Sequence, residues 1–251
     1  MPALVRERMT SPALTLSKDA PVSEALNLFR TRRISAVPVM DQTAIVGVLS
    51  MSDVLELGRK NEAWEDKTIG SVMTPDVIGV APHDTLAFAA DKMVEENVHR
   101  LIVQDGLRIA GILSVRDVLH EVKRRRAMTP LSSIMSSPVE TVDLGEPLDR
   151  AVERLATSGM HGLVVVDGTW PVGVFSQGEA IELRHVPPSV REHTTVEQVM
   201  SYETVCLDEG TPVYRAAGYA MAMDVRRILV VKNRDLVGIV SCLDLAGTLR
   251  A

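Results

Sequence analysis

A fourfold internal repeat constrains this chain more than any other feature of its sequence. Each copy opens with a methionine followed by a hydroxyl residue: Arg8-Met9-Thr10, Val72-Met73-Thr74, Ile134-Met135-Ser136 and Val199-Met200-Ser201. Each copy closes with a Gly-x-x-Ser-x-x-acid segment: Gly47 to Asp53, Gly111 to Asp117, Gly173 to Glu179 and Gly238 to Asp244. In all four copies the glycine follows the methionine by 38 residues and the acid follows it by 44. Four copies of one structural unit without internal insertions are therefore expected.

The second copy shows the local structure most clearly. It predicts a short strand at Val77–Val80, then a helix from about Thr85 to Glu96. The apolar face of this helix is Leu86, Ala89, Ala90 and Met93. Two apolar runs separated by the turn Asp105-Gly106 predict a hairpin, and a second helix is expected from Ser114. The unit is therefore an α/β (α+β) repeat of order β-α-β-β-α, too small to bury its own sheet.

Because a single unit leaves its sheet uncovered, neighbouring copies are expected to pair. Copies 1 and 2 predict a first module at residues 1–126, with repeats at about 8–60 and 70–125. Copies 3 and 4 predict a second module at residues 127–251, with repeats at about 132–185 and 196–250. The basic run Lys123–Arg126 ends the first module. It is expected to be a solvated helix end, favoured there by the helix dipole.

Composition restricts the ligands and partners that the chain can have. The 251 residues carry a net charge of −6, so nothing draws the whole molecule to nucleic acid or to an anionic membrane. A bound anion must then be held by a local group of basic side chains. Cys206 and Cys242 form no C-x-x-C motif, and no apolar run is long enough for a signal core or a membrane span. A cytoplasmic protein without metal, membrane or nucleic-acid contacts is expected.

The acids that close the repeats admit two interpretations. A carboxylate at a helix start has two oxygens and can accept hydrogen bonds from the vicinal hydroxyls of a ribose, which suits Asp53, Asp117 and Asp244. Alternatively, serine and acid form a capping box, in which each satisfies a backbone amide at the helix start. Capping boxes prefer Glu or Gln at this place, and three copies have the shorter Asp, which favours the ribose interpretation. The preceding serines, Ser50, Ser114 and Ser241, can cap and bind.

Basic residues recur at a second shared position, but only in some copies. The residues 26 and 27 positions after each methionine are Ser35-Ala36, His99-Arg100, His161-Gly162 and Arg226-Arg227. Repeats 2 and 4 are therefore the cationic members of their pairs and are suited to phosphate. The alternatives stay open. Arg226 and Arg227 can be a solvated turn, and His99 and His161 can be partly buried imidazoles with ordinary partners.

The Met-Thr openings, the Val37-Pro38-Val39-Met40-Asp41 strand and the Gly-x-x-Ser-x-x-Asp closings resemble the cystathionine-β-synthase (CBS) domain family, whose paired repeats are called Bateman modules. The segment Val98–Val103 looks like the γ subunits of AMP-activated protein kinases, in which a His-Arg pair contacts phosphate. The resemblance implies adenosine ligands such as AMP, ADP, ATP or S-adenosylmethionine, bound in clefts between paired repeats. No further cofactor is implied.

The resemblance also implies which residues share a site. The closing acid of one repeat holds ribose, while the basic position of its partner serves base and phosphate. The pairs implied are Asp53 with His99 and Arg100, Asp117 with Ile34 and Ser35, Asp244 with Met160 and His161, and Glu179 with Arg226 and Arg227. Arg116 joins the phosphate set. Because aromatic residues make up only 3% of the chain, aliphatic side chains must enclose adenine. The candidates are Leu14, Ile34, Ser35, Ile78, Val98 and Met160, most of which can equally be core.

These observations predict a regulatory, energy-sensing protein that binds an adenosine compound, without catalytic residues of its own. A homodimer, or association with a regulated protein, is expected. Two other functions are compatible with the sequence. One is an interaction module that binds no ligand. The other is a regulatory fragment related to a CBS-containing enzyme such as inosine-monophosphate dehydrogenase, although the repeats leave no room for that enzyme's barrel of about 250 residues.

Overall fold

The computed structural model describes residues 2–32, 34, 36–51, 53–54, 67–106, 108–157, 162–176, 179–180, 183, 186–202 and 204–250. The chain divides into two compact units, Met1–Val118 with Arg250, and Leu119–Leu249 with Ala251. The boundary falls inside one helix, α4 (Val115–Arg125). The modules drawn from the sequence, 1–126 and 127–251, stay a prediction.

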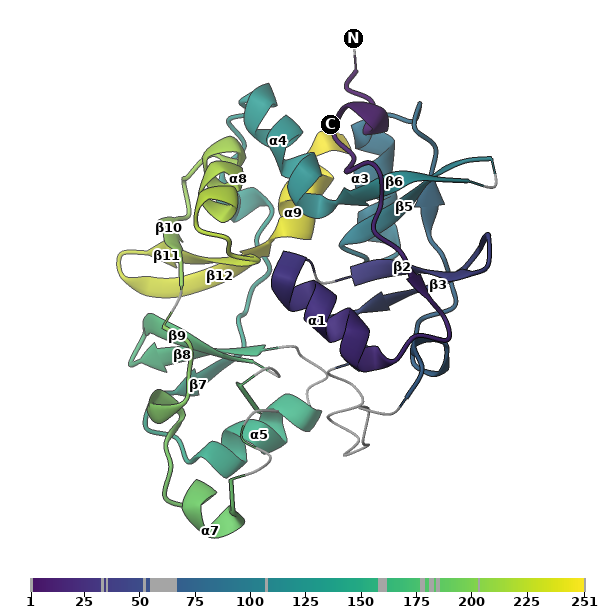
Figure 1. Ribbon diagram of the computed structural model, residues 1–251. Coiled ribbons are helices and arrows are strands. Elements are labelled where there is room, and N and C mark those ends of the chain that lie inside the picture. Colours follow the sequence, from purple (N-terminus) through teal and green to yellow (C-terminus); the bar gives the residue numbers. More distant parts are fainter. Residues whose placement is uncertain are drawn as a thin grey trace. The chain divides into compact units, whose positions relative to one another are not determined.

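The first unit contains two three-stranded sheets, one for each of the first two repeats (Figure 1). The elements of repeat 1 are β1 (Leu16–Ser17), α1 (Val22–Arg32), β2 (Ala36–Asp41) and β3 (Ala44–Ser50). Those of repeat 2 are β4 (Gly79–Val80), α3 (Leu86–Glu95), β5 (Arg100–Asp105) and β6 (Arg108–Ser114), followed by α4. In both sheets the first strand is parallel to the second, and the second is antiparallel to the third.

The second unit repeats this arrangement. Repeat 3 comprises β7 (Thr141–Asp143), α5 (Leu148–Thr157), β8 (Gly162–Asp167), β9 (Trp170–Ser176) and the short α7 (Pro188–Arg191). Repeat 4 comprises β10 (Cys206–Asp208), α8 (Val213–Ala222), β11 (Arg227–Lys232), β12 (Asp235–Ser241) and α9 (Cys242–Gly247). The strand directions match those of the first unit. The predicted α/β class and the four repeats are confirmed, and the second helix of the unit has described bounds in repeats 2 and 4, as α4 and α9.

Repeat 2 shows how closely local sequence determines these elements. Thr85 caps α3, because its side chain accepts a hydrogen bond from the Phe88 amide at 3.1 Å, and Glu96 ends the helix. The four residues predicted as its apolar face, Leu86, Ala89, Ala90 and Met93, are at most 1% exposed. Gly106 takes a positive φ of 62° in the hairpin turn, a conformation that glycine adopts without strain. Only the first strand differs: two of its four predicted residues, Gly79 and Val80, pair with β5.

Paired repeats within each unit contact one another where an opening segment crosses a closing strand. In the first unit, Thr10 bridges to Ile112 and Thr74 bridges to Val48, so the contact is reciprocal between repeats 1 and 2. In the second unit the corresponding bridges join Ser136 to Ile239 and Ser201 to Val174. The expected pairing of repeat 1 with 2 and of repeat 3 with 4 follows from these bridges.

The glycine of each closing segment is what allows this crossing. A Cβ atom at Gly111 would lie 2.5 Å from the Thr10 carbonyl oxygen, and one at Gly47 would lie 2.6 Å from the Thr74 carbonyl oxygen. Real Cβ atoms do not approach backbone oxygens so closely, so a side chain here would push the paired repeats apart. Each opening methionine packs on the same glycine of the partner repeat: Met9 on Gly111, Met73 on Gly47, Met135 on Gly238 and Met200 on Gly173. The constant spacing of methionine and glycine therefore encodes the contact between repeats.

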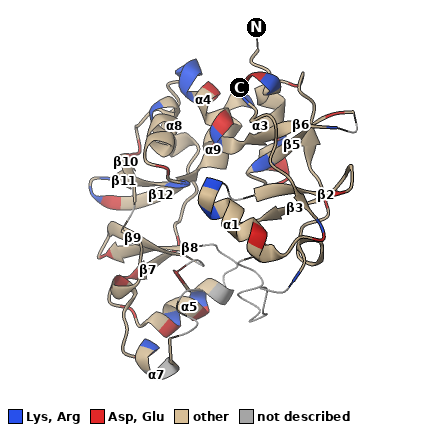
Figure 2. Ribbon diagram, in the orientation of Figure 1, with Lys and Arg blue, Asp and Glu red and all other residues tan. Residues whose placement is uncertain are grey.

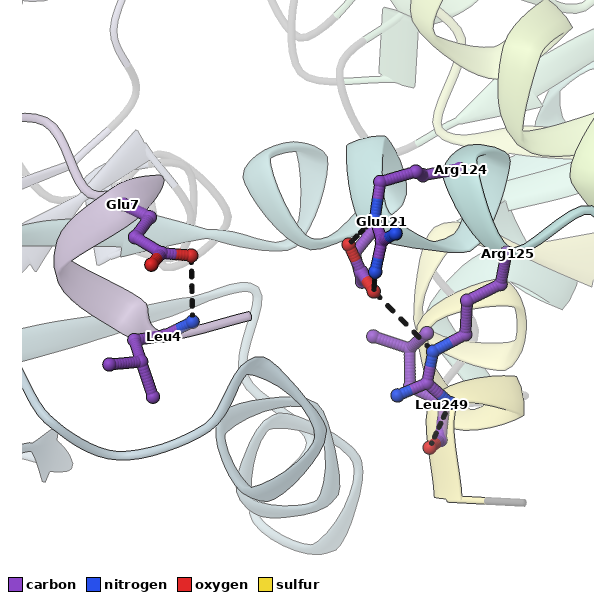
Figure 3. Close-up of polar contacts among 6 residues, drawn as sticks. All are labelled: Leu4, Glu7, Glu121, Arg124, Arg125 and Leu249. Carbon is purple, nitrogen blue, oxygen red and sulfur yellow. Dashed lines mark hydrogen bonds and ion pairs between the residues drawn. The ribbon is translucent and has the colours of Figure 1, made fainter. Parts of the chain in front are cut away.

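One charged side chain is buried among the described residues. Glu121 in α4 is 2% exposed and accepts hydrogen bonds from Arg124 at 2.6 and 2.7 Å (Figure 3). Arg125 lies 3.5 Å from the same carboxylate and donates to the Leu249 carbonyl at 3.0 Å. The Arg124 hydrogen bonds are the main cause that lowers the pKa of Glu121 below its ordinary value of 4.5. Glu121 thus holds Arg125 in position to satisfy a backbone oxygen near the end of repeat 4.

The crossing of opening and closing segments predicts opposite effects for two glycine substitutions. Gly111→Ala should lower the free energy of unfolding by about 1 to 3 kcal/mol, because the new methyl group meets the Thr10 carbonyl. Gly218→Ala, in the interior of α8, should raise it by about 0.5 to 1 kcal/mol, because its Cβ would meet nothing closer than 3.8 Å. Urea denaturation of both variants measures the difference. Equal effects of the two substitutions would contradict this role for Gly111.

The Glu121 cluster predicts a pH-dependent contribution to stability. Since folding lowers the pKa of this carboxyl, its contribution is complete above the ordinary value of 4.5 and disappears as the pH falls through the lowered value. Glu121→Gln should therefore destabilise the protein at neutral pH, by about 1 to 2 kcal/mol because both arginines are partly solvated. The deficit should shrink in acid, whereas the exposed control Glu197→Gln should change little. A deficit that stays constant with pH would show that packing, not charge, holds Glu121.

Candidate functional site

Each closing acid lies in the first turn of a helix and helps to cap it. One carboxylate oxygen accepts hydrogen bonds from both the amide and the hydroxyl of the serine three residues earlier, in the pairs Ser50 with Asp53, Ser114 with Asp117, Ser176 with Glu179 and Ser241 with Asp244. For Asp53, Asp117 and Asp244 the serine hydroxyl accepts from the acid's own amide in return. The argument that Asp would project into a cleft because capping boxes prefer Glu is therefore wrong. Aspartate and glutamate both accept from the serine amide and hydroxyl here.

Capping uses one oxygen of each acid, so the other decides what else the group can bind. In Asp117 and Asp244 this second oxygen, Oδ1, has no hydrogen-bond donor from the described part of the chain. In Asp53 the second oxygen accepts from the Thr74 hydroxyl at 2.9 Å. A half-buried carboxylate with one oxygen held at a helix start and one oxygen open can accept a ligand hydroxyl without losing its cap.

Thr74 is a site residue that the sequence reasoning missed. It lies in the opening of repeat 2, yet its side chain reaches the closing acid of repeat 1, so opening and closing segments of paired repeats meet at one point. The signal was present in the sequence. A hydroxyl residue follows the methionine in all four copies, at Thr10, Thr74, Ser136 and Ser201. Whether this hydroxyl contacts the partner repeat depends on how the opening segment crosses the closing strand. The spacing of residues in the sequence does not predict that crossing.

The second residue of each basic position lies at the start of a strand, opposite the capping serine of its own repeat. Arg100 faces Ser114, and Arg227 faces Ser241. The corresponding residues of the odd repeats, Ala36 and Gly162, are small. The preceding His99 and Arg226 are exposed, and their carbonyls accept from the first residues of α4 and α9. Arg116, in the first turn of α4, is half-buried.

Arg227 is the basic side chain with the most specific surroundings. A Cβ placed on Gly162, in repeat 3, would lie 3.5 Å from an Arg227 guanidinium nitrogen and 3.4 Å from the Cβ of Ser176. The Arg227 head group thus reaches the closing segment of the partner repeat that ends at Glu179, through space that a side chain at position 162 would restrict. Burial of the head group is the main cause that lowers the pKa of Arg227, and repulsion from Arg226 adds to it. Arg227 as a whole residue is exposed, so this desolvation is partial.

No acid neutralises this guanidinium within the described residues, where Arg227 makes no side-chain hydrogen bond or ion pair. A partly desolvated cation near a second cation is stabilised when an anion joins it. The surroundings of Arg227 therefore suit an anionic ligand.

The residues expected around adenine are only partly described. Leu14 is 45% exposed, while Ile34, Ile78 and Val98 are half-buried. Ile34 packs against the core of repeat 1, and the carbonyl of Ile78 and the amide of Val98 are bonded to neighbouring backbone. Ser35, Met160 and His161 lie outside the described residues. The structure therefore describes the residues expected at ribose and phosphate more completely than those expected at adenine.

The described residues form no metal site, membrane-spanning helix or disulfide. They contain no group of three or more His, Cys, Asp or Glu side chains arranged to hold a metal ion. None of the helices in those ranges combines the length and apolar character needed to cross a membrane. Cys206 and Cys242 are both unbridged.

The caps predict how the acids affect the ligand-free protein. Asp117→Ala and Asp244→Ala should each lower the free energy of unfolding by about 0.5 to 2 kcal/mol, because the serine amide and hydroxyl lose their acceptor. Asp53→Ala should cost at least as much, since it also leaves the Thr74 hydroxyl without its acceptor. Thermal and urea unfolding without nucleotide measure these losses, with exposed Asp235→Ala as the control. Unchanged stability in all three variants would contradict the capping role.

Comparison with known proteins shows which family has this architecture. The profile of the family described as "CBS domain" matches residues 5–60, 69–124, 131–186 and 196–251. The 5'-AMP-activated protein kinase subunit gamma-3 of Sus scrofa is 34% identical over 109 residues, which are 40% of this chain and 21% of that protein. An inosine-5'-monophosphate dehydrogenase of Methanocaldococcus jannaschii is 36% identical over 124 residues, covering 48% of this chain and 23% of the enzyme. The chain thus spans less than a quarter of the length of either relative.

A solved structure extends the likeness to nearly the whole chain. Protein MJ1225 of Methanocaldococcus jannaschii, described as a proposed archaeal homologue of the AMP-activated protein kinase γ subunit, superposes with a TM-score of 0.80. The superposition covers 98% of this chain and 99% of that one at 16% identity, so it shows a shared fold. With four matched repeats, reciprocal crossings and capped closing acids, this chain belongs to the CBS domain family.

Proposed function

We propose that this chain is a regulatory protein without a reaction of its own, which binds adenine nucleotides between paired CBS repeats. The observation that carries the proposal is the Arg227 guanidinium, which approaches Gly162 and the closing segment of repeat 3 and has no acid partner among the described residues. A nucleotide phosphate would supply the missing negative charge and could accept two parallel hydrogen bonds from the guanidinium. Binding would give Arg227 the negatively charged partner that it lacks among the described residues.

The closing acids supply the second half of the proposed site. Glu179 ends the segment that Arg227 approaches, and its cap uses only Oε2. The other oxygen would accept a ribose hydroxyl while Arg227 holds the phosphate. Asp117 and Asp244 offer the same open oxygen in their own sites, and Asp53 would share a ligand hydroxyl with Thr74. The phosphate partners proposed with Asp53 are His99 and Arg100.

The relatives favour adenine over other bases. The name of the relative gamma-3 subunit connects that protein with AMP, and the matching 109 residues are 34% identical. The inosine-monophosphate dehydrogenase match supports a CBS-containing enzyme as an alternative context for the same fold. A ligand-free interaction module is the remaining alternative, and the unpaired Arg227 argues against it. We propose a cytoplasmic location, in keeping with the free cysteines.

A thermal-shift panel tests the proposal. AMP, ADP and ATP should each stabilise the protein, by about 2.7 kcal/mol at a hundred times the dissociation constant of one site. GMP should stabilise it less, because backbone groups that bond the edge of adenine would be left unpaired by guanine. A panel in which no adenosine compound, S-adenosylmethionine included, raises the midpoint would remove nucleotide binding as the function.

Arg227 gives the sharper test. Arg227→Ala should weaken AMP binding by about ten- to a hundredfold and change adenosine binding little, because only the phosphate meets the guanidinium. Arg227→Lys should recover part of the loss, since it restores the charge but not the paired donors. The exposed Arg150→Ala is the control. Calorimetry measures all of these affinities. Equal losses for AMP and adenosine would mean that Arg227 has a structural role.

A further inference from the structure

The exposed face of α8 and the carboxyl end of α4 meet in the second unit. The Lys123 side chain crosses Gly218, whose Cβ position lies 3.8 Å from the Lys123 Cε. The Thr129 carbonyl accepts from the Val213 amide at 2.9 Å, which places Met128 beside the first turn of α8. Together these contacts define an α4–α8 surface, composed of Lys123, Arg126, Met128, Arg215, Tyr219 and Met223.

This surface exposes large apolar side chains in a regular pattern. Met128 is 70% exposed, Tyr219 49% and Met223 62%. Tyr219 and Met223 are four residues apart, so they stand next to each other at the carboxyl end of α8. The opposite face of α8 is buried through Val213, Ala216, Ala217 and Ala220, so the exposed stripe does not serve the core. Tyrosine and methionine are enriched at protein interfaces, where they combine apolar area with adaptable packing.

The charged residues of the α4–α8 surface are all basic, and the nearest acid in the sequence is Asp224, which follows Met223 just beyond the end of α8. Helix α8 contains no acidic residue, and Figure 2 shows it without Asp or Glu, while Lys and Arg gather at the end of α4. Lys123 and Arg126 are exposed, and no acid pairs with either of them in the described ranges. Arg215 is also exposed and bonds to the Tyr214 hydroxyl rather than to a carboxylate. Three cations therefore border an apolar stripe.

The same position of the repeat is arranged differently in the first unit, which shows that this charge is not a general property of the fold. Arg250 stands 50 residues after Met200, as Lys123 stands 50 residues after Met73. Arg250 forms ion pairs with Asp91 and Glu95 of α3. Gly218 of α8 occupies the repeat position of Asp91, 18 residues after the opening methionine, so Lys123 meets a glycine instead of an acid. The acids that neutralise this position in one unit are missing from the other.

We propose that the α4–α8 surface docks an acidic segment of a partner protein, with apolar side chains at helical spacing. Carboxylates of that segment would pair with Lys123, Arg126 and Arg215, and its apolar side chains would cover Tyr219, Met223 and Met128. Complementary charge accelerates association and excludes basic partners, while the buried apolar anchors supply most of the affinity. The protein's net charge of −6 disfavours a nucleic acid as the occupant.

A fluorescent peptide tests the proposal on the full chain. The probe is an amphipathic helix with glutamate on one face and leucine on the other, and fluorescence anisotropy measures its binding. Lys123→Glu and Met223→Ser should each weaken binding by about tenfold or more, because they remove a charge partner and an apolar anchor. The matched controls Arg108→Glu and Phe88→Ser change an exposed cation and an exposed aromatic of the first unit and should leave binding unchanged.

Competing probes separate the occupants. A peptide with lysine in place of glutamate, and polyglutamate without leucine, should both bind poorly. Tighter binding of a single-stranded oligonucleotide than of the acidic peptide would overturn the proposal in favour of nucleic acid. Self-association that Lys123→Glu abolishes would overturn it in favour of a second copy, and failure of the acidic peptide to bind would overturn it outright. AMP affinity should be the same with Lys123→Glu, so loss of docking and loss of the proposed nucleotide function are distinguishable.

Discussion

The fold depends on one close backbone contact, the crossing of an opening segment over the glycine of its partner repeat. Each unit makes this contact twice, through reciprocal bridges such as Thr10 to Ile112 and Thr74 to Val48. A repeat of this size cannot bury its sheet alone, and the crossing joins two of them without a long insertion. It also brings the hydroxyl of one repeat to the acid of the other, as Thr74 and Asp53 show. The contact that stabilises the pair is therefore also the contact that builds the candidate site.

The candidate site reuses groups that the fold already requires. One oxygen of each closing acid caps a helix, which leaves the second oxygen open in Asp117 and Asp244 and bonded to Thr74 in Asp53. The cap holds the carboxylate in place before any ligand arrives, so binding need not order it. Arg227 contributes a positive charge that no acid neutralises among the described residues. A rigid acceptor in the closing segment that an unpaired cation approaches suits a ligand that carries both hydroxyls and a phosphate.

Much of the fold could be predicted from the sequence, because each weak local pattern occurs in all four repeats. The helix at Leu86–Glu95 and the turn at Gly106 follow from apolar period and turn chemistry, and repetition extends them to the other copies. The capping role of the aspartates was underestimated, because the preference for Glu is statistical and Asp reaches the same serine amide here. The hydrogen bond from Thr74 to Asp53 and the approach of Arg227 to Gly162 could not be predicted, since both depend on how one repeat packs against another. Local patterns specify elements, whereas sites between repeats are specified by packing.

The structure of the full chain with bound AMP tests the account most directly. The account predicts an AMP molecule in the second unit, with its phosphate about 3 Å from the Arg227 guanidinium and a ribose hydroxyl donating to the oxygen of Glu179 that is not engaged by Ser176. The cap between Ser176 and Glu179 should be unchanged by the ligand. AMP bound with its phosphate in solvent and away from Arg227, or with the Ser176 cap broken to free the carboxylate, would contradict the account.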